Sequence, residues 1–261
     1  MPPRELGRAV RAGQIEAGLL SVVDAFRAPD FELLAAMGIA VDGPAHSVLL
    51  FSSQHPSRLQ GATVAVTDET STSFRLLRLI LEQRFRVSPS VFVRTSAPGI
   101  TEATDGQEAS LLIGDAALRE ASALGLVPGK RDYSSGILEM PSGARWPYVV
   151  DLAAEWKRWQ GLPFVFAQWM VRRDVMASSR TKLVRVLDRS LVQSLRNLEV
   201  LAAQYAPDGG LDPVAAHAYL MGFTYRLGAA EHESIGRFRS MLEAEPWWEM
   251  ARPLVLEGRD A

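Results

Sequence analysis

Short apolar runs alternate with amphipathic stretches along the first two thirds of the chain, a pattern typical of an α/β protein. The runs at residues 15–20, 47–51, 62–67 and 110–113 are bounded by polar or turn residues, so each predicts a short buried strand. Residues 74–85 carry apolar side chains on one face and charged side chains on the other, which predicts a helix.

The stretch 148–169 holds more local structure than any other. It combines a strand end, a short aromatic helix with Asp151 as its expected N-cap, a Gly-Leu-Pro turn and a second apolar strand. Such a passage predicts a crossing between two lobes, where ligand clefts tend to lie. Before it, residues 121–147 are rich in Gly, Pro and Ser and predict a loop-rich margin with a hairpin. The aromatic residues of the stretch are expected in the core rather than on a ligand: Trp156, Trp159, Phe164 and Phe166.

Beyond residue 169 the pattern becomes helical. Leucines from Leu183 to Leu198 mark one long amphipathic helix, Asp212 before Pro213 predicts the cap of another, and Gly228 predicts a helix end. The whole chain is therefore expected to form a two-lobed, periplasmic-binding-protein-like (type II) α/β fold with C-terminal helices. We expect lobe I to comprise residues 1–53 and 163–261, and lobe II residues 54–162.

Composition narrows the function classes. The 261 residues are 48% hydrophobic, enough for a full core, and their net charge of −2 leaves no basic surface for nucleic acid. The first residues lack the apolar segment of a signal peptide, and no run approaches the ~18 apolar residues of a membrane span. We therefore expect a cytoplasmic protein with a small-molecule partner and no nucleic-acid or membrane partner.

Cofactor motifs are missing. The sequence has no cysteine and no nucleotide-binding or nucleophile-elbow motif, so neither a metal nor a cofactor is indicated. Among the four histidines, which show no metal-type spacing, His46 precedes a strand at a possible cleft, although a lone histidine is more often an ordinary surface or core residue. Candidate chemistry must therefore come from hydroxyl and carboxyl groups.

The polar loop TDETSTS, residues 67–73, joins a predicted strand to a predicted helix. Free N–H groups and the helix dipole at such a position favour a bound anion, so a carboxylate or phosphate fits there. The alternative is an ordinary helix N-cap by Thr72 or Ser73, and Asp68 and Glu69 disfavour a highly charged phosphate. The substrate-binding candidates in this loop are Thr70, Ser71, Thr72 and Ser73.

Two further candidate positions lie at the ends of strands. The turn Gly-Pro-Ala-His before the strand at 47–51 leaves Ser47 able to offer its hydroxyl and N–H to a ligand, unless it only starts the strand. Gly114 and Asp115 follow the strand at 110–113, where open α/β sheets place ligands. Asp115 is a candidate base or polar orienter, or else the cap of a helix beginning at Ala116. Ser47 and Asp115 are the catalytic candidates, and Ser47 and Gly114 are expected to contact substrate.

Several stretches together resemble a menaquinone-biosynthesis family that includes chorismate dehydratase, the first enzyme of the futalosine route. The resemblance is carried by GPAHSVLLFSS (43–53), TVAVTDETSTSFRLLRLIL (63–81), LLIGDAALRE (111–120) and VVDLAAEWKRWQGLPFVFAQWMVR (149–172), and more weakly by residues 219–242. It implies conversion of chorismate into 3-[(1-carboxyvinyl)oxy]benzoate with loss of water and no cofactor. Ser47 and the loop 70–73 would then bind the substrate from facing lobes, and either Asp115 or a substrate carboxylate would accept the ring proton.

The resemblance also leaves alternatives and one departure. The sister enzyme 1,4-dihydroxy-6-naphthoate synthase uses a histidine after the strand equivalent to 111–113, where this chain has Gly114 and Asp115; a non-enzymatic solute-binding protein of the same fold is the third possibility. Family members usually open with a strand carrying a Tyr-Leu-Asn motif, a helix and a second strand before the equivalent of residues 2–6. We therefore expect lobe I to be incomplete at its N-terminus.

Overall fold

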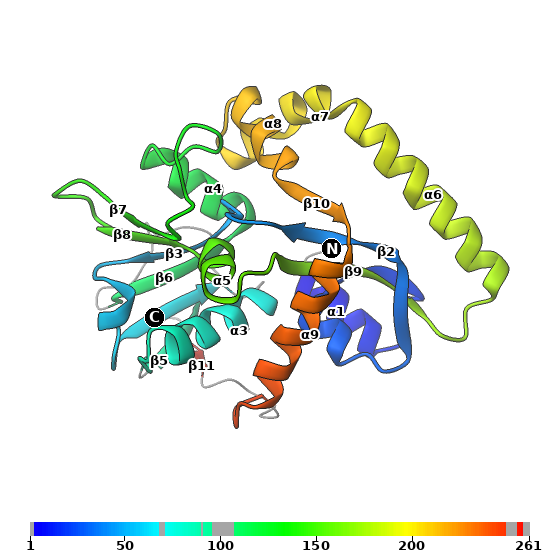
Figure 1. The fold of residues 1–261 in the computed structure, drawn as a ribbon, viewed down its shortest axis with the longest axis horizontal. Helices are drawn as coiled ribbons and strands as arrows, with labels where there is room; N and C mark the ends of the chain where they lie inside the picture. Colours follow the sequence, from blue (N-terminus) through cyan, green and yellow to red (C-terminus); the bar gives the residue numbers. More distant parts are fainter. Residues whose placement is uncertain (1–2, 68–70, 90, 96–106, 249–254, 258–261) are drawn as a thin grey trace.

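The strands form two sheets in the computed structural model, which describes residues 3–67, 71–89, 91–95, 107–248 and 255–257 (Figure 1). The first, sheet A, has the strand order β1-β9-β2-β10, and its paired strands are antiparallel. Its strands come from widely separated parts of the chain: β1 (Ala17–Ser21), β2 (Phe31–Val41), β9 (Phe164–Arg172) and β10 (Phe223–Arg226).

Sheet B has the order β11-β5-β4-β6-β3-β8-β7. β4 pairs in parallel with β5 and β6, whereas β3 is antiparallel to β6 and β8. The boundary expected near residue 53 would place β3 in the other lobe, but hydrogen bonding joins this strand to sheet B. The strands are β3 (Val48–Ser52), β4 (Thr63–Thr67), β5 (Val91–Thr95), β6 (Ala109–Ile113), β7 (Ile137–Glu139), β8 (Tyr148–Asp151) and β11 (Val255–Glu257).

Aromatic side chains fill the core between the sheets. Trp156 is fully buried, and its ring packs edge-on against Phe164 and Phe238, so Trp156 and Phe164 are core residues as expected. Phe166 is only partly buried. The helices before β9 are α1 (Pro3–Arg11), α2 (Val22–Phe26), α3 (Thr72–Leu79) with a π-helical continuation (Ile80–Arg84), α4 (Gly114–Ala123) and α5 (Leu152–Gln160).

Three of the helices after β9, α6 to α8, form an arch. In Figure 1, α6 leaves the side of sheet A, α7 continues it, and α8 arrives beside α4, whereas α9 lies outside the arch. The single helix expected through Leu198 is interrupted at Asn197, and Gly228 is the N-cap position of α9 rather than a helix end. Asp212 caps α8 as predicted, accepting from Ala215 N at 2.8 Å. The helices after β9 are α6 (Ala177–Arg196), α7 (Leu198–Tyr205), α8 (Pro213–Met221) and α9 (Ala229–Glu243).

The arch packs loosely at its start, since α6 has no buried residue along its length. Within the described part of the chain, no helix combines the length and apolar character needed to cross a membrane.

Candidate functional site between the two sheets

A pocket of about 370 Å³ lies where the two sheets and the C-terminal helices meet. β2 and β9 of sheet A contribute apolar wall, the turn before β3 and the end of β6 contribute polar groups, and α8 and β10 close one side. Three of the candidates come together here: Ser47, Ser73 and Gly114. A volume within the ~300–1,000 Å³ typical of small-molecule sites suits a ligand of one ring with short substituents.

Asp151 holds the turn that presents Ser47. Its buried carboxylate caps α5 by accepting from Ala153 N and Ala154 N, both at 3.1 Å. The same carboxylate accepts from Ala45 N at 3.1 Å and from His46 N at 2.7 Å. The expected helix cap is therefore also an anchor between the 148–169 stretch and the turn before β3.

The electrostatics of this anchor follow from burial. Burial raises the pKa of Asp151 to about 6, although its four backbone N–H donors favour the ionised form. Burial also lowers the pKa of His46 to about 4, so this imidazole is neutral near pH 7. The His46 ring lies edge-on to Tyr133, with ring centroids 4.4 Å apart, and its side chain is not among the groups that line the pocket.

Ser47 is nearly buried, with 5% of its surface exposed, yet it reaches the pocket. The Tyr219 hydroxyl donates to Ser47 Oγ at 2.9 Å, and the Ser47 carbonyl accepts from Gly114 N at 2.8 Å. Gly114 has φ of +60°, a left-handed conformation that glycine adopts without strain. The ends of β3 and β6 are thus tied together directly beside the pocket.

The hydroxyl loop before α3 is only partly directed into the pocket. Ser73 lines it, whereas Thr72 Oγ1 accepts a hydrogen bond from Val23 N at 3.2 Å and so joins α3 to α2. Ser71 occupies the N-cap position of α3 without a side-chain capping bond, so neither Thr72 nor Ser73 is the cap considered from sequence. Thr70 lies outside the described residues.

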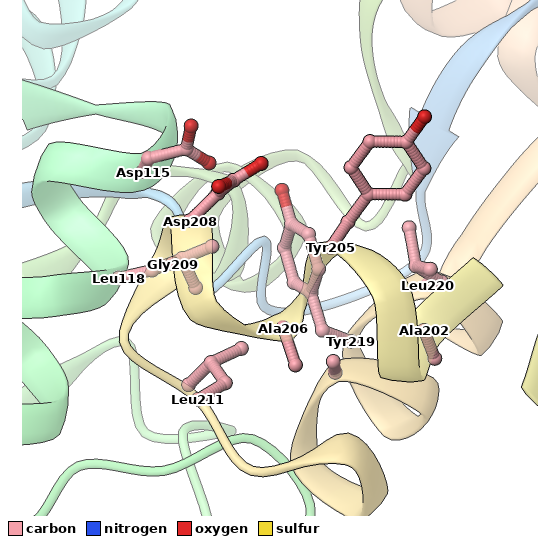
Figure 2. Close-up of a pocket in the computed structure, with 11 residues that line it drawn as sticks. Asp115, Leu118, Ala202, Tyr205, Ala206, Asp208, Gly209, Leu211, Tyr219 and Leu220 are labelled. Atoms are coloured by element: carbon pink, nitrogen blue, oxygen red, sulfur yellow. The ribbon is translucent and has the colours of Figure 1, made fainter. Parts of the chain in front are cut away.

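Asp115 borders a second pocket, of about 260 Å³. Figure 2 shows its carboxylate beside that of Asp208, with the rings of Tyr205 and Tyr219 on the other side. α4 already begins at Gly114, with Ile113 at its N-cap position, so Asp115 is not the cap of this helix. The structure therefore brings Ser47, Ser73 and Gly114 to one pocket and Asp115 to its neighbour, while Tyr219 lines both.

Sequence reasoning missed the tyrosines on the C-terminal side. Tyr219 on α8 and Tyr225 on β10 both line the pocket, and the Tyr225 hydroxyl donates to the Leu220 carbonyl at 3.0 Å. Both tyrosines lie in the stretch 219–242 that carries the weaker family resemblance, which was the available signal, but it did not indicate a partner far away in sequence. Among the described residues, no group of three or more His, Asp or Glu side chains is placed to hold a metal ion.

Known proteins match both the sequence and the fold. Residues 1–244 match the family described as menaquinone biosynthesis. Chorismate dehydratase of Thermus thermophilus is 30% identical over 241 residues, covering 92% of this chain and 84% of that protein.

Solved structures give the architecture. A protein from Archaeoglobus fulgidus superposes with a TM-score of 0.70 at 21% identity, covering 94% of this chain and 84% of its own. The periplasmic aliphatic sulphonate binding protein SsuA from Escherichia coli superposes with a TM-score of 0.54 at 14% identity, covering 99% and 82%. The expected type II binding-protein-like fold is thereby confirmed, and the chain belongs to the menaquinone-biosynthesis family.

Proposed function

We propose that this protein is a chorismate dehydratase, a carbon–oxygen lyase of the futalosine route that forms 3-[(1-carboxyvinyl)oxy]benzoate and water. The observation that carries the proposal is the likeness to the Thermus thermophilus chorismate dehydratase along 92% of the chain. The pocket between the sheets is the proposed site. The cytoplasmic location expected from the sequence stays a prediction.

The dehydration requires few catalytic groups from the protein. Loss of one ring proton and of the ring hydroxyl as water makes the ring aromatic, so the site has to orient the substrate, assist the proton transfer and exclude bulk water. Ile39, Phe166 and Phe223 supply apolar wall for a ring. Ser47 and Ser73 supply hydroxyl groups for substrate oxygens, and the described residues that line the pocket include no Lys or Arg.

The proposal is tested by incubating purified protein with chorismate and following product by chromatography, ultraviolet absorbance and mass. The expected result is an aromatic product that has lost one water, formed in proportion to enzyme. Ser47→Ala should lower kcat/KM at least roughly tenfold, since a hydrogen bond to the reacting substrate is removed. Full turnover and binding in this variant would refute the proposed site.

The solute-binding proteins of the same fold motivate one alternative. If chorismate, measured by calorimetry, binds but is never converted, a binding function replaces the enzymatic one. If it neither binds nor reacts, the substrate assignment fails. Ser73→Ala serves as the matched variant, and we expect it to weaken binding. Ser47 precedes β3 and Ser73 lies on α3 after β4, so both belong to the sheet B side of the pocket and not to facing lobes as expected.

A further inference from the structure

Tyr219 reaches Ser47 from a distant part of the chain. It lies on α8, within the C-terminal arch, whereas Ser47 ends the turn that leads into β3 of sheet B. The Tyr219 hydroxyl donates to Ser47 Oγ at 2.9 Å, and both residues line the pocket between the sheets. This contact joins the arch to the centre of the proposed site.

The backbone around Ser47 is fixed independently of Tyr219. Asp151 binds the N–H groups of Ala45 and His46, and Gly114 N donates to the Ser47 carbonyl. What these contacts leave adjustable is the serine side chain. A hydroxyl has one proton and two acceptor lone pairs. Tyr219 occupies an acceptor position, and the Ser47 hydroxyl donates to the Ala45 carbonyl at 3.3 Å. This bond is longer than the usual hydroxyl–oxygen hydrogen bond, so a substrate oxygen in the pocket can replace the carbonyl as the acceptor.

We propose that Tyr219 is a positioning residue, which holds the Ser47 hydroxyl so that its proton is donated to a substrate oxygen in the pocket. The inference rests on the proposed function and adds to it the direction of the hydrogen bond: Ser47 acts as a donor and recognises a carboxylate or hydroxyl oxygen. A donor chain from tyrosine to serine to substrate also polarises the serine O–H, which strengthens its bond to an anionic oxygen.

The surroundings of Tyr219 suit a fixed donor. Its ring packs edge-on against Phe223, with centroids 5.0 Å apart. Burial, followed by the charges of Asp115 and Asp151, raises the pKa of Tyr219 to about 12, while its hydrogen bond to Ser47 acts in the opposite direction. The phenol therefore keeps its proton throughout the neutral range.

A double-mutant cycle tests whether Tyr219 acts through Ser47. Tyr219→Phe removes only the hydroxyl, and we expect kcat to fall roughly tenfold with less change in KM. In a protein that already carries Ser47→Ala, the same change should alter kcat less than about twofold, because the serine hydroxyl that it positions is gone. Tyr148→Phe, which removes a phenol hydroxyl from β8 outside the pocket, should keep wild-type kcat and KM.

The outcomes separate this inference from the proposed function. The positioning role would be overturned if the kcat losses of the two single variants multiply in the double variant. Wild-type kcat in Tyr219→Phe would overturn it as well. If the wild type does not dehydrate chorismate, the proposed function fails, and neutron diffraction from deuterium-exchanged crystals decides the geometry. A Tyr219 deuteron directed at Ser47 Oγ and a Ser47 deuteron directed into the pocket support the donor chain. A Ser47 deuteron on the Ala45 carbonyl, with the Tyr219 deuteron on Ser47 Oγ, also supports it, because this is the long bond that a substrate oxygen would replace. A Ser47 deuteron directed at the Tyr219 oxygen refutes it.

Discussion

The polar groups of the pocket between the sheets come from residues at the ends of strands and the start of a helix. Ser47, Ser73 and Gly114 stand where turns meet strands or strands meet helices, and those junctions are readable from sequence. Their meeting in one pocket follows from the pairing of β6 with β3, which Ser47 precedes, and with β4, which leads to α3 and Ser73. Tyr219 was not predictable in the same way, because its bond to Ser47 spans 172 positions and arises only from tertiary packing. Whether these residues bind substrate stays a prediction.

Asp115 was singled out for its place after β6, but it borders the neighbouring pocket and is exposed. A substrate carboxylate is thereby favoured as the proton acceptor. We expect Asp115→Asn to keep kcat within about threefold, measured by product formation at saturating chorismate. A loss of ~10²–10⁴-fold, the usual contribution of a general base, would assign the proton transfer to Asp115 instead.

Asp151 and His46 give opposite pH dependences of stability. Burial raises the pKa of Asp151 to about 6, so the native chain keeps a proton that the unfolded chain releases near pH 4. Taken by itself, the Asp151 carboxyl therefore lowers the free energy of unfolding as pH rises from about 4 to 6. Burial lowers the pKa of His46 to about 4, so this group lowers stability as pH falls from about 6.5 to 4. Each effect is on the order of 3 kcal/mol, and in the wild type they nearly cancel.

Single substitutions should separate the two pH dependences of the free energy of unfolding. Relative to wild type, Asp151→Asn should lose stability more steeply on acidification from pH 6.5 to 4, because only the His46 effect remains. His46→Asn should show the opposite slope, and asparagine tolerates the φ of +59° at this position. Urea unfolding at several pH values measures both. Variant curves that run parallel to wild type would contradict the assignment of these shifts.

Regular elements followed their patterns, and irregular ones did not. β2 was missed because Ala35 and Ala36 have positive φ and the register with β9 shifts between Leu33 and Gly38, which breaks the two-residue alternation. The sequence pattern did not predict β10, because Gly228 indicated the end of a helix that would include these residues. By contrast, the strands with unbroken apolar runs, such as β3 and β6, were predicted within a residue or two. Local pattern succeeds where the backbone is regular.

At the element scale, the π-helical end of α3 depends on the tail, the described residues from Ala244 to Trp248 that follow α9. Trp247 is 9% exposed; its Nε1 donates to Glu82 Oε2 at 2.8 Å, and the Arg78 guanidinium lies 4.2 Å from the ring centroid. Trp247→Ala should lower the free energy of unfolding by about 3 kcal/mol. Trp247→Phe keeps a ring over Arg78 and should cost about 1 kcal/mol. Chemical denaturation measures the free energy of unfolding of both variants. Equal losses would contradict the separation of the ring's contribution from that of the hydrogen bond to Glu82.

At the scale of the whole molecule, the tail also ties the two sheets together. The family match ends at residue 244, and the resemblance seen in the sequence ends at residue 242, so neither covers the segment that follows. Arg27, at the end of α2 beside sheet A, donates to the Trp248 carbonyl at 2.9 Å and stacks on its ring at 4.5 Å. Arg75, on α3 beside sheet B, lies 5.6 Å from the same ring. Trp248 therefore contacts side chains of both α2 and α3, the two helices that the hydrogen bond from Val23 N to Thr72 Oγ1 also joins.

Trp248→Ala tests this bridge. Because the ring is only partly buried, we expect a loss of about 1 kcal/mol in the free energy of unfolding, smaller than that of Trp247→Ala. The distinguishing readout is amide hydrogen exchange followed by mass spectrometry: exchange should rise in both α2 and α3 for Trp248→Ala, but only around α3 for Trp247→Ala, the matched control. An increase confined to one helix in Trp248→Ala would show that the tail stabilises that helix alone and does not bridge the two.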